Sequence, residues 1–335
     1  MARRPVAVFA IAPWAFHDVF PADLITRLRQ SVDVDATVTF TSFDGKRAAR
    51  ALATAEILLT GWGCPRIDAE VLKAAPGLRA IVLAAGTVKA IVDPGVLERG
   101  LVVSSAAAAN AVPVADYTIA MLVLGAKRVF GRAGHYAAGA APSTWQQGAG
   151  TGLYQCTVGV IGASHVGRHV LRRLRDFDVD VLLSDPHVSP EEASLLGAEL
   201  VDVDELCRRG DLITVHAPAL AETRHLLDER RLALLPDRAV VINTARGSLI
   251  DTEALTRVCA TGRVSAVLDV TDPEPLPLEH PLFGMPNVLV TPHLAGAQGR
   301  ELRRLGEFAV GELERFLSGR PLRGRVEAAQ LGYIA

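Results

Sequence analysis

Three residue types that could together perform acid–base chemistry on an anion occur in the second half of this 335-residue chain. Arg246 and His293 each lie just beyond a short apolar run typical of a buried strand, and Glu274 follows a third such run. Arginine can hold a carboxylate through two parallel hydrogen bonds, and a histidine beside a carboxylate can give or take a proton near neutral pH. Because parallel sheets bind ligands beyond the carboxyl ends of their strands, these residues predict a proton-transfer site with an anion clamp.

Each of these residues also has an interpretation without chemistry. Arg246 could pair with the nearby Asp251, and Glu274 could be an exposed glutamate of its proline-rich loop. His293 could be a capping or core histidine, and His216, at the end of another apolar run, could simply hydrogen-bond to the backbone. The chemical interpretation is favoured because the residues occur together at strand ends.

The stretch from Cys156 to Leu174 has the pattern of a dinucleotide-binding turn. Cys156–Ile161 predicts a buried strand, Gly162 follows at once, and Gly167 precedes residues with helical spacing. The free N–H groups of a helix N-terminus in this context can bind a pyrophosphate. Ser164 stands where the G-x-G-x-x-G fingerprint has its second glycine, and its hydroxyl could donate to a phosphate instead. The glycines alone are equally compatible with an ordinary strand–helix turn.

Asp185 ends the next predicted strand, Val179–Ser184, and lies 23 residues after Gly162. This is near the spacing of about 20 residues at which an acid binds the adenosine ribose hydroxyls. A turn residue before Pro186 is the plain alternative. No Lys or Arg follows closely, so a 2′-phosphate would meet a carboxylate without a cationic partner. We therefore expect NAD rather than NADP.

Alternating strand and helix patterns must position these residues. In the first part of the chain they predict strands Val6–Ile11, Ile57–Thr60, Ala80–Ala84 and Val102–Ser104 and helices Pro21–Gln30 and Asp68–Ala75. In the second part they predict strands Cys156–Ile161, Val179–Ser184, Leu212–Val215, Ala239–Asn243, Val264–Leu268 and Val288–Val290. A long helix, Val114–Val129, and an aperiodic loop or intersubunit arm, 131–152, separate the two parts, and a helix Arg300–Ser318 follows them. Such alternation predicts parallel sheets covered by helices on both faces.

Composition argues against several classes of protein. The 35 Lys and Arg residues are balanced by 37 Asp and Glu, without a long basic run, so we expect no nucleic-acid partner. Four widely spaced cysteines predict a reducing, cytoplasmic compartment and neither a disulfide framework nor a metal site. We expect no membrane association, because no stretch approaches the roughly 18–20 uninterrupted apolar residues of a membrane helix. The apolar N-terminal run is interrupted by Pro13 and predicts a first strand rather than a signal peptide.

The strings NTARGSLID (243–251) and LDVTDPEPLPLEHPLFGMPNVLVTPHLAG (268–296) resemble the D-isomer-specific 2-hydroxyacid dehydrogenase family. The altered glycine turn, VHAPALAETRHLL (215–227) and, more loosely, LAAGTVKAIV (83–92) extend the resemblance over most of the chain from about residue 80 to residue 300. It implies an α/β fold of two doubly wound parallel-sheet domains. A Rossmann NAD-binding domain, residues 113–295, would be inserted in a flavodoxin-like substrate domain formed by residues 1–112 and 296–335. It also implies a homodimer, with an arm that holds His135, Tyr136 and Trp145.

The same resemblance implies roles for individual residues. Arg246 would bind the substrate carboxylate and carbonyl, His293 would be the general acid and base, and Glu274 would be its acidic partner. Substrate contacts are implied at Gly86, Thr87, Arg246 and His293. NAD contacts are implied at Gly162, Ser164, His165, Val166, Gly167, Asp185, Ala217, Pro218, Thr223, Thr244, Ala245, Arg246, Asp269, His293 and Gly296, with Asp269 at the nicotinamide amide. The departures from the pattern are Ser164 and the separation of 28 residues between Arg246 and Glu274, one residue shorter than is usual in the family.

The resemblance thus implies reversible hydride transfer between NAD(H) and a small 2-hydroxy or 2-oxo acid, such as glyoxylate or hydroxypyruvate. An NAD(H)-sensing protein of the co-repressor type on the same scaffold is an alternative, although no basic face or long peptide-binding extension supports it. A phosphite-type dehydrogenase is a further alternative. Formate as the donor is disfavoured because formate enzymes that resemble this family lack the glutamate that Glu274 provides.

Overall fold

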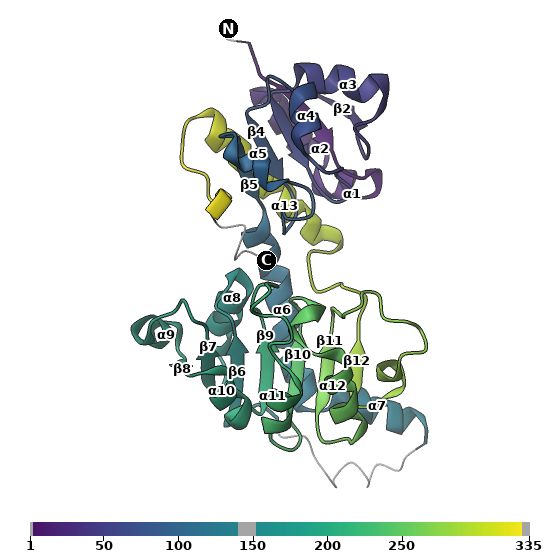
Figure 1. Ribbon diagram of the computed structural model, residues 1–335, viewed down its shortest axis with the longest axis vertical. Helices are drawn as coiled ribbons and strands as arrows, with labels where there is room; N and C mark the ends of the chain where they lie inside the picture. Colours follow the sequence, from purple (N-terminus) through teal and green to yellow (C-terminus); the bar gives the residue numbers. More distant parts are fainter. Residues whose placement is uncertain (1–2, 140–151, 330–335) are drawn as a thin grey trace. The chain divides into compact units, whose positions relative to one another are not determined.

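The computed structural model describes residues 3–139 and 152–329. These residues form two compact units. Unit 1 comprises the described residues of Met1–Ala111 and Ala297–Ala335, and unit 2 those of Val112–Gly296. The chain therefore leaves unit 1 once and returns to it once (Figure 1).

Unit 1 is built on a five-stranded parallel sheet. Its strands are β1 (Val6–Ala10), β2 (Asp33–Thr39), β3 (Ile57–Thr60), β4 (Ala80–Leu83) and β5 (Val102–Ser105). They are arranged in the order β2-β1-β3-β4-β5, which is the flavodoxin-like order of doubly wound sheets. The expected class of this domain is confirmed.

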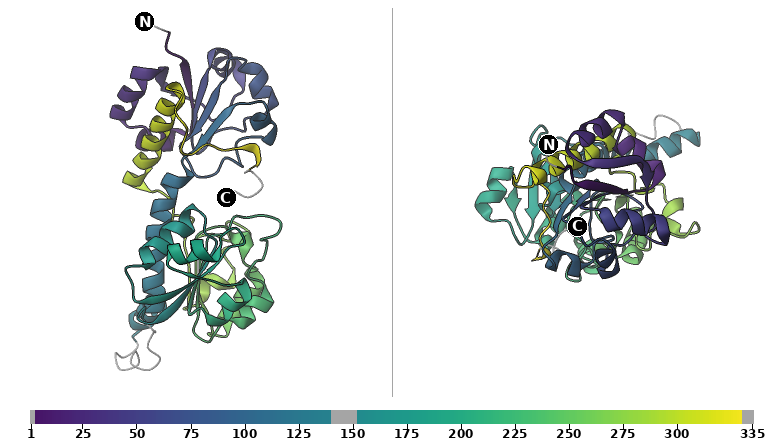
Figure 2. Two further views of the ribbon diagram at one scale, coloured as in Figure 1. Left: turned by 90° about the vertical axis from the view of Figure 1, so that its left-hand side faces the viewer. Right: turned by 90° about the horizontal axis from the view of Figure 1, so that it is seen from above.

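Helices cover both faces of this sheet (Figure 2). One layer consists of α1 (Pro13–Val19), α2 (Ala22–Ser31) and α13 (Leu302–Leu317), which pack with Ala7 and Phe9 of β1. The other consists of α3 (Gly45–Thr54), α4 (Ala69–Ala74) and α5 (Pro94–Glu98), which pack with Val8 and Ala10. Successive side chains of a strand point to opposite faces, so one apolar run supplies both cores.

Unit 2 is built on a seven-stranded parallel sheet. Its strands are β6 (Cys156–Ile161), β7 (Val179–Ser184), β8 (Glu199–Leu200), β9 (Leu212–Val215), β10 (Val240–Asn243), β11 (Ser265–Leu268) and β12 (Val288–Val290). The strand order is β12-β11-β10-β9-β6-β7-β8. Successive strands are added first on one side of β6 and then on its other side, as in dinucleotide-binding sheets. The expected Rossmann architecture is confirmed.

Two helical layers also cover this second sheet (Figures 1 and 2). Helices α6 (Ala107–Ala126), α8 (His165–Leu174) and α9 (Pro190–Leu196) contribute to one core. Helices α10 (Val203–Arg209), α11 (Glu229–Leu234) and α12 (Thr252–Ala260) contribute to the other. A further helix, α7 (Val129–Ala137), follows α6 and contacts β12.

The largest error of the sequence prediction concerns α6 and α7. Helix α6 begins at Ala107, within the alanine-rich stretch that we expected to precede it, because alanine has the highest helix propensity. It ends at Ala126, and Arg128 adopts a left-handed conformation (φ 53°) before α7 begins. Part of the predicted loop is therefore helical, including His135 and Tyr136. Trp145 and the rest of 140–151 lie outside the described residues.

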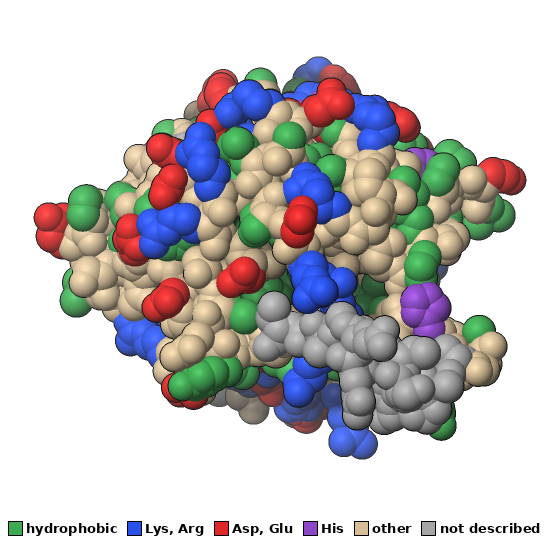
Figure 3. Space-filling view, turned by 90° about the horizontal axis from the view of Figure 1, so that it is seen from below, with side chains coloured by type: hydrophobic (Ala, Val, Ile, Leu, Met, Phe, Trp, Pro, Cys, Tyr) green, Lys and Arg blue, Asp and Glu red, His purple; other side chains and the backbone are tan. Residues whose placement is uncertain are grey.

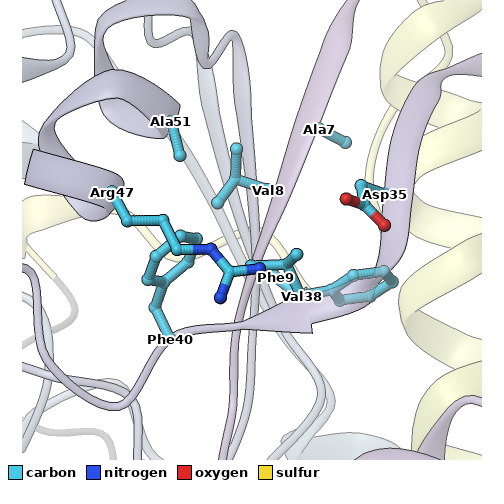
Figure 4. Close-up of a pocket in the computed structure, with 8 residues that line it drawn as sticks. All are labelled: Ala7, Val8, Phe9, Asp35, Val38, Phe40, Arg47 and Ala51. Carbon is cyan, nitrogen blue, oxygen red and sulfur yellow. The ribbon is translucent and has the colours of Figure 1, made fainter.

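The short strand β8 and the edge strand β2 were not predicted, although Val34, Ala36 and Val38 alternate as a half-buried strand should. The β1–β2 register jumps from Ala7↔Val34 to Phe9↔Thr39. A pocket of about 140 Å³ is lined by residues of β1, β2 and α3 (Figure 4). Arg47 of α3 extends toward this pocket, and none of the candidate site residues lines it.

Within the described residues, one helix, α6, is long and apolar enough to cross a membrane by length and composition. Its 18-residue window has a mean hydropathy of 1.5. Core helices of soluble proteins meet the same criterion, and Ala115, Leu122 and Ala126 of this helix belong to a core of unit 2.

Charged side chains of both signs are interspersed over the face shown in Figure 3. Many charged side chains of the described residues form ion pairs, such as Arg209 with Glu199 at 2.7 Å and Arg231 with Asp204 at 2.9 Å. This mixture accords with the small net charge of −2.

Candidate active site

Glu274 and His293 form a hydrogen-bonded pair on unit 2. His293 Nδ1 lies 2.6 Å from Glu274 Oε1. Because an ionised carboxylate can only accept, Nδ1–H is the donor, and Nε2 remains for chemistry. Both side chains are partly exposed, 52% for His293 and 39% for Glu274. The pair therefore has the arrangement of an accessible acid–base group that a carboxylate orients.

The loop that carries His293 is fixed by the buried carboxylate of Asp269, directly after β11. Thr291 Oγ1 donates to Asp269 Oδ1 at 2.6 Å, and the N–H groups of Leu294 and Ala295 donate to the same carboxylate at 2.9 Å each. His293 itself has φ 53°, a left-handed conformation that strains a residue other than glycine. The bonds to Asp269 help to hold this conformation. Asp269 thus has a structural role beside the cofactor contact that we expected.

Arg246 follows β10 and is half-buried. Its side chain donates to the Ala245 carbonyl at 2.6 Å, and its own carbonyl accepts from Asn243 Nδ2 at 2.8 Å. Burial lowers the pKa of the guanidinium, while the nearby Glu274 carboxylate raises it. Among the described residues Arg246 forms no ion pair with an acid, and Asp251 caps α12 by accepting from the Ala254 N–H. The alternative pairing of Arg246 with Asp251 is therefore wrong, and the guanidinium can bind an anionic ligand.

The glycine turn of unit 2 brings a helix N-terminus close to the sheet. Gly162 has φ 96°, and a Cβ there would lie 2.6 Å from the Ala217 nitrogen. A Cβ on Gly167 would lie 2.0 Å from the Gly162 oxygen, so only glycine permits this approach. Ser164 caps α8 by accepting from the Gly167 N–H at 3.4 Å. Its hydroxyl hydrogen can still be donated to a phosphate.

Asp185 lies beside this turn at the end of β7. One carboxylate oxygen accepts from the Ala163 N–H at 2.7 Å and the other from the His187 N–H at 2.8 Å. The side chain is partly exposed and keeps lone pairs for ribose hydroxyls. The close glycine turn, the capped helix N-terminus and this carboxylate fit an adenine dinucleotide.

The residues after β9 pack against the same turn. Thr223 Oγ1 donates to the Pro218 carbonyl at 2.6 Å, which closes the loop that begins at Ala217. His216 is fully buried, and its Nε2 lies 2.9 Å from Thr214 Oγ1. Burial lowers the pKa of His216 to about 3, so the imidazole is neutral. The side-chain bond to the backbone that was the alternative interpretation of His216 is absent among the described residues, and its Nδ1 has no hydrogen-bond partner there.

The other expected site residues lie as follows. His165 and Val166 begin α8, Thr244 and Ala245 follow β10, and Gly296 ends unit 2. Gly86 and Thr87 lie in unit 1 beyond β4, where Ser105 Oγ donates to the Gly86 carbonyl. The structure thus places all of the expected catalytic and cofactor residues on unit 2 and Gly86 and Thr87 on unit 1.

Sequence reasoning missed the side chains that support these loops, namely Tyr117, Thr118 and Thr291. Tyr117 and Thr118 are hydrogen-bonding side chains within the largely apolar helix α6, and this was the available signal. Their partners are 174 and 126 residues away in the sequence. Only the tertiary fold reveals such pairs.

Comparison with known proteins identifies the family of unit 2. Residues 120–295 match the family model of the NAD-binding domain of D-isomer specific 2-hydroxyacid dehydrogenases. A glyoxylate reductase of Thermofilum pendens is 33% identical over 258 residues, which cover 76% of each chain. The crystal structure of the TT0316 protein from Thermus thermophilus has a TM-score of 0.76 and 31% identity, covering 96% of this chain and 99% of that one.

A D-3-phosphoglycerate dehydrogenase of Methanocaldococcus jannaschii is 29% identical over 306 residues. The match covers 90% of this chain and 57% of that relative, and the chain spans about half the length of the phosphoglycerate dehydrogenases that it matches. The family match covers more than half of the present chain and includes the glycine turn, Arg246, Glu274 and His293. The chain therefore belongs to the D-isomer specific 2-hydroxyacid dehydrogenase family, and unit 2 carries the family's NAD-binding domain.

Proposed function

We propose that this protein is an NAD-dependent oxidoreductase that interconverts a D-2-hydroxy acid and its 2-oxo acid. The observation that carries the proposal is the His293–Glu274 pair at 2.6 Å near the half-buried guanidinium of Arg246, which forms no ion pair with an acid among the described residues. A proton donor and a fixed cation are the two groups that a carbonyl needs when it is reduced.

Three residues have separate roles in the proposed reduction of the oxo acid. When bound, NADH supplies the hydride for the oxo carbon. His293 donates its Nε2 proton to the carbonyl oxygen, and Glu274 orients the ring and stabilises its cationic form. Arg246 binds the substrate carboxylate and stabilises the negative charge that develops on the carbonyl oxygen. In the reverse reaction the neutral imidazole accepts the hydroxyl proton.

The cofactor would be held by the residues of the glycine turn and of the neighbouring strand ends. The N-terminus of α8 and the Ser164 hydroxyl would bind the pyrophosphate, and Asp185 would bind the adenosine ribose. Further proposed contacts are His165, Val166, Ala217, Pro218, Thr223, Thr244, Ala245, Asp269 and Gly296. Gly86 and Thr87 of unit 1 are proposed to bind substrate.

The proposed substrates are small 2-oxo acids. The relatives named glyoxylate reductase and D-3-phosphoglycerate dehydrogenase support this class.

We also propose a cytoplasmic homodimer. All four cysteines are free and buried, as suits a reducing compartment, and Tyr136 of α7 is 68% exposed, as suits a residue of an intersubunit arm.

The test is NADH oxidation by the purified full chain with glyoxylate, hydroxypyruvate, pyruvate, phenylpyruvate and the 2-oxo acid of 3-phosphoglycerate, with NADPH in parallel. We expect turnover of at least one oxo acid with NADH, a preference over NADPH, and a D-configured product. Tight NADH binding without turnover of any of them would contradict the proposal and favour a sensor. Reduction of NAD by phosphite alone would favour the phosphite alternative.

A further inference from the structure

Two consecutive residues of α6 hold the two loops of the candidate active site. Tyr117 Oη lies 2.9 Å from Thr291 Oγ1, two residues before His293. Thr118 Oγ1 lies 3.0 Å from Thr244 Oγ1, two residues before Arg246. Neither Tyr117, Thr118 nor Thr291 belongs to the residues that the proposed reaction assigns.

Counting hydrogens fixes the direction of these bonds. Thr291 donates its single hydroxyl hydrogen to the Asp269 carboxylate at 2.6 Å, so it must accept from the Tyr117 hydroxyl. Thr118 likewise donates to the Val114 carbonyl at 2.8 Å and accepts from Thr244. Burial raises the pKa of the Tyr117 phenol, so that it stays a donor. The chain of bonds therefore runs from Tyr117 through Thr291 to Asp269.

The seven-stranded sheet places Thr244, Asp269 and Thr291 side by side. Asn243, Leu268 and Val290 are register partners across β10, β11 and β12. Thr244, Asp269 and Thr291 are the next residue of each strand. The Asp269 carboxylate also accepts from the Leu294 and Ala295 N–H groups, on the far side of His293. The bonds to Thr291 and to residues 294–295 thus bracket the strained backbone of His293.

We propose that Tyr117 is a positioning residue for His293, acting through the Thr291 hydroxyl and the Asp269 carboxylate. This inference rests on the proposed function, in which His293 is the acid and base. Tyr117 fixes the rotamer of Thr291, and Thr291 completes the bonds that hold the loop of residues 291–295. Thr118 positions the loop of Arg246 through Thr244 in the same way. Helix α6 therefore positions both the His293 loop and the Arg246 loop.

The test compares Tyr117→Phe, Thr291→Val and the double variant by steady-state kinetics. Tyr117→Phe keeps the ring and removes only the donor, and we expect kcat to fall about tenfold with KM changed less than about twofold. In the Thr291→Val background the Tyr117→Phe change should have less than about a twofold further effect, because its route to His293 is already broken. Thr291→Ser, which keeps the hydroxyl, should restore most of the activity.

A second readout does not require turnover. In protein with ¹⁵N-labelled histidine, the ring signals of His293, assigned with His293→Gln, should shift or broaden in Tyr117→Phe. They should be unchanged in Thr118→Val and in Tyr154→Phe, a matched change at an exposed tyrosine of the same unit. Unchanged His293 signals in Tyr117→Phe, or additive losses in the double variant, would overturn the positioning role. If the wild-type protein turned over no oxo acid, the proposed function would fail while the ring signals still decided this inference.

Discussion

At the scale of single residues, the site depends on a carboxylate that orients an imidazole. The Glu274–His293 bond of 2.6 Å is short, as expected when one partner is ionised. Both side chains are partly exposed, so solvent screens the pair and its contribution to folding stability is small. We infer that the pair serves function rather than folding.

The substitution Glu274→Gln tests this role. The amide oxygen of the new side chain would still accept from Nδ1–H, but the change removes the negative charge beside the ring that gives up the proton. We therefore expect kcat/KM for reduction of the oxo acid to fall at least about tenfold. The measurement is kcat/KM, with Glu279→Gln, an exposed glutamate of the same loop, as the control. A kcat/KM within about twofold of the wild-type value would contradict the electrostatic role.

At the scale of elements, every candidate residue of unit 2 lies in a loop that follows a strand or in the first turn of α8. These strands were predictable because each is an apolar run bounded by polar or turn residues. The start of helix α6 was predicted too late, at Val114, because Pro113 and the alanine tract before it suggested a helix start. In the structure the helix begins at Ala107 and accommodates Pro113 in its interior. Strand β2 was missed because its edge position leaves Asp33, Asp35 and Thr37 exposed and dilutes its apolar character.

Helix α13 offers a matched test of element packing. A Cβ on Gly306 would lie 1.8 Å from the Val19 carbonyl oxygen of α1, whereas a Cβ on Gly311 would meet nothing within 4 Å. We expect Gly306→Ala to destabilise unit 1 by about 1–3 kcal/mol through overpacking. Gly311→Ala should stabilise it by about 0.5–1 kcal/mol, since alanine favours the helix. Thermal or denaturant unfolding measures both, and equal effects of the two changes would disprove the close packing of α13 on α1.

At the scale of the whole molecule, the chain forms unit 1 from both of its ends and unit 2 from its middle. The sequence pattern predicted two parallel sheets, and the resemblance predicted which one carries NAD-binding residues. The supporting contacts could not be predicted, because the partners of Asp269, Tyr117 and Thr118 are set by strand order and register, not by local pattern. Local residue types therefore indicated the proposed reacting groups, and the fold was needed to show which side chains hold them.

The most direct test of the account is to compare wild-type protein with His293→Gln for both oxo-acid turnover and NADH binding. The account predicts that turnover falls by about 100-fold or more, because the proton donor is lost. The Kd for NADH should change by no more than a few-fold, because the glycine turn and Asp185 are untouched. Turnover within about twofold of wild type would contradict the assignment of His293 as the acid and base of this protein.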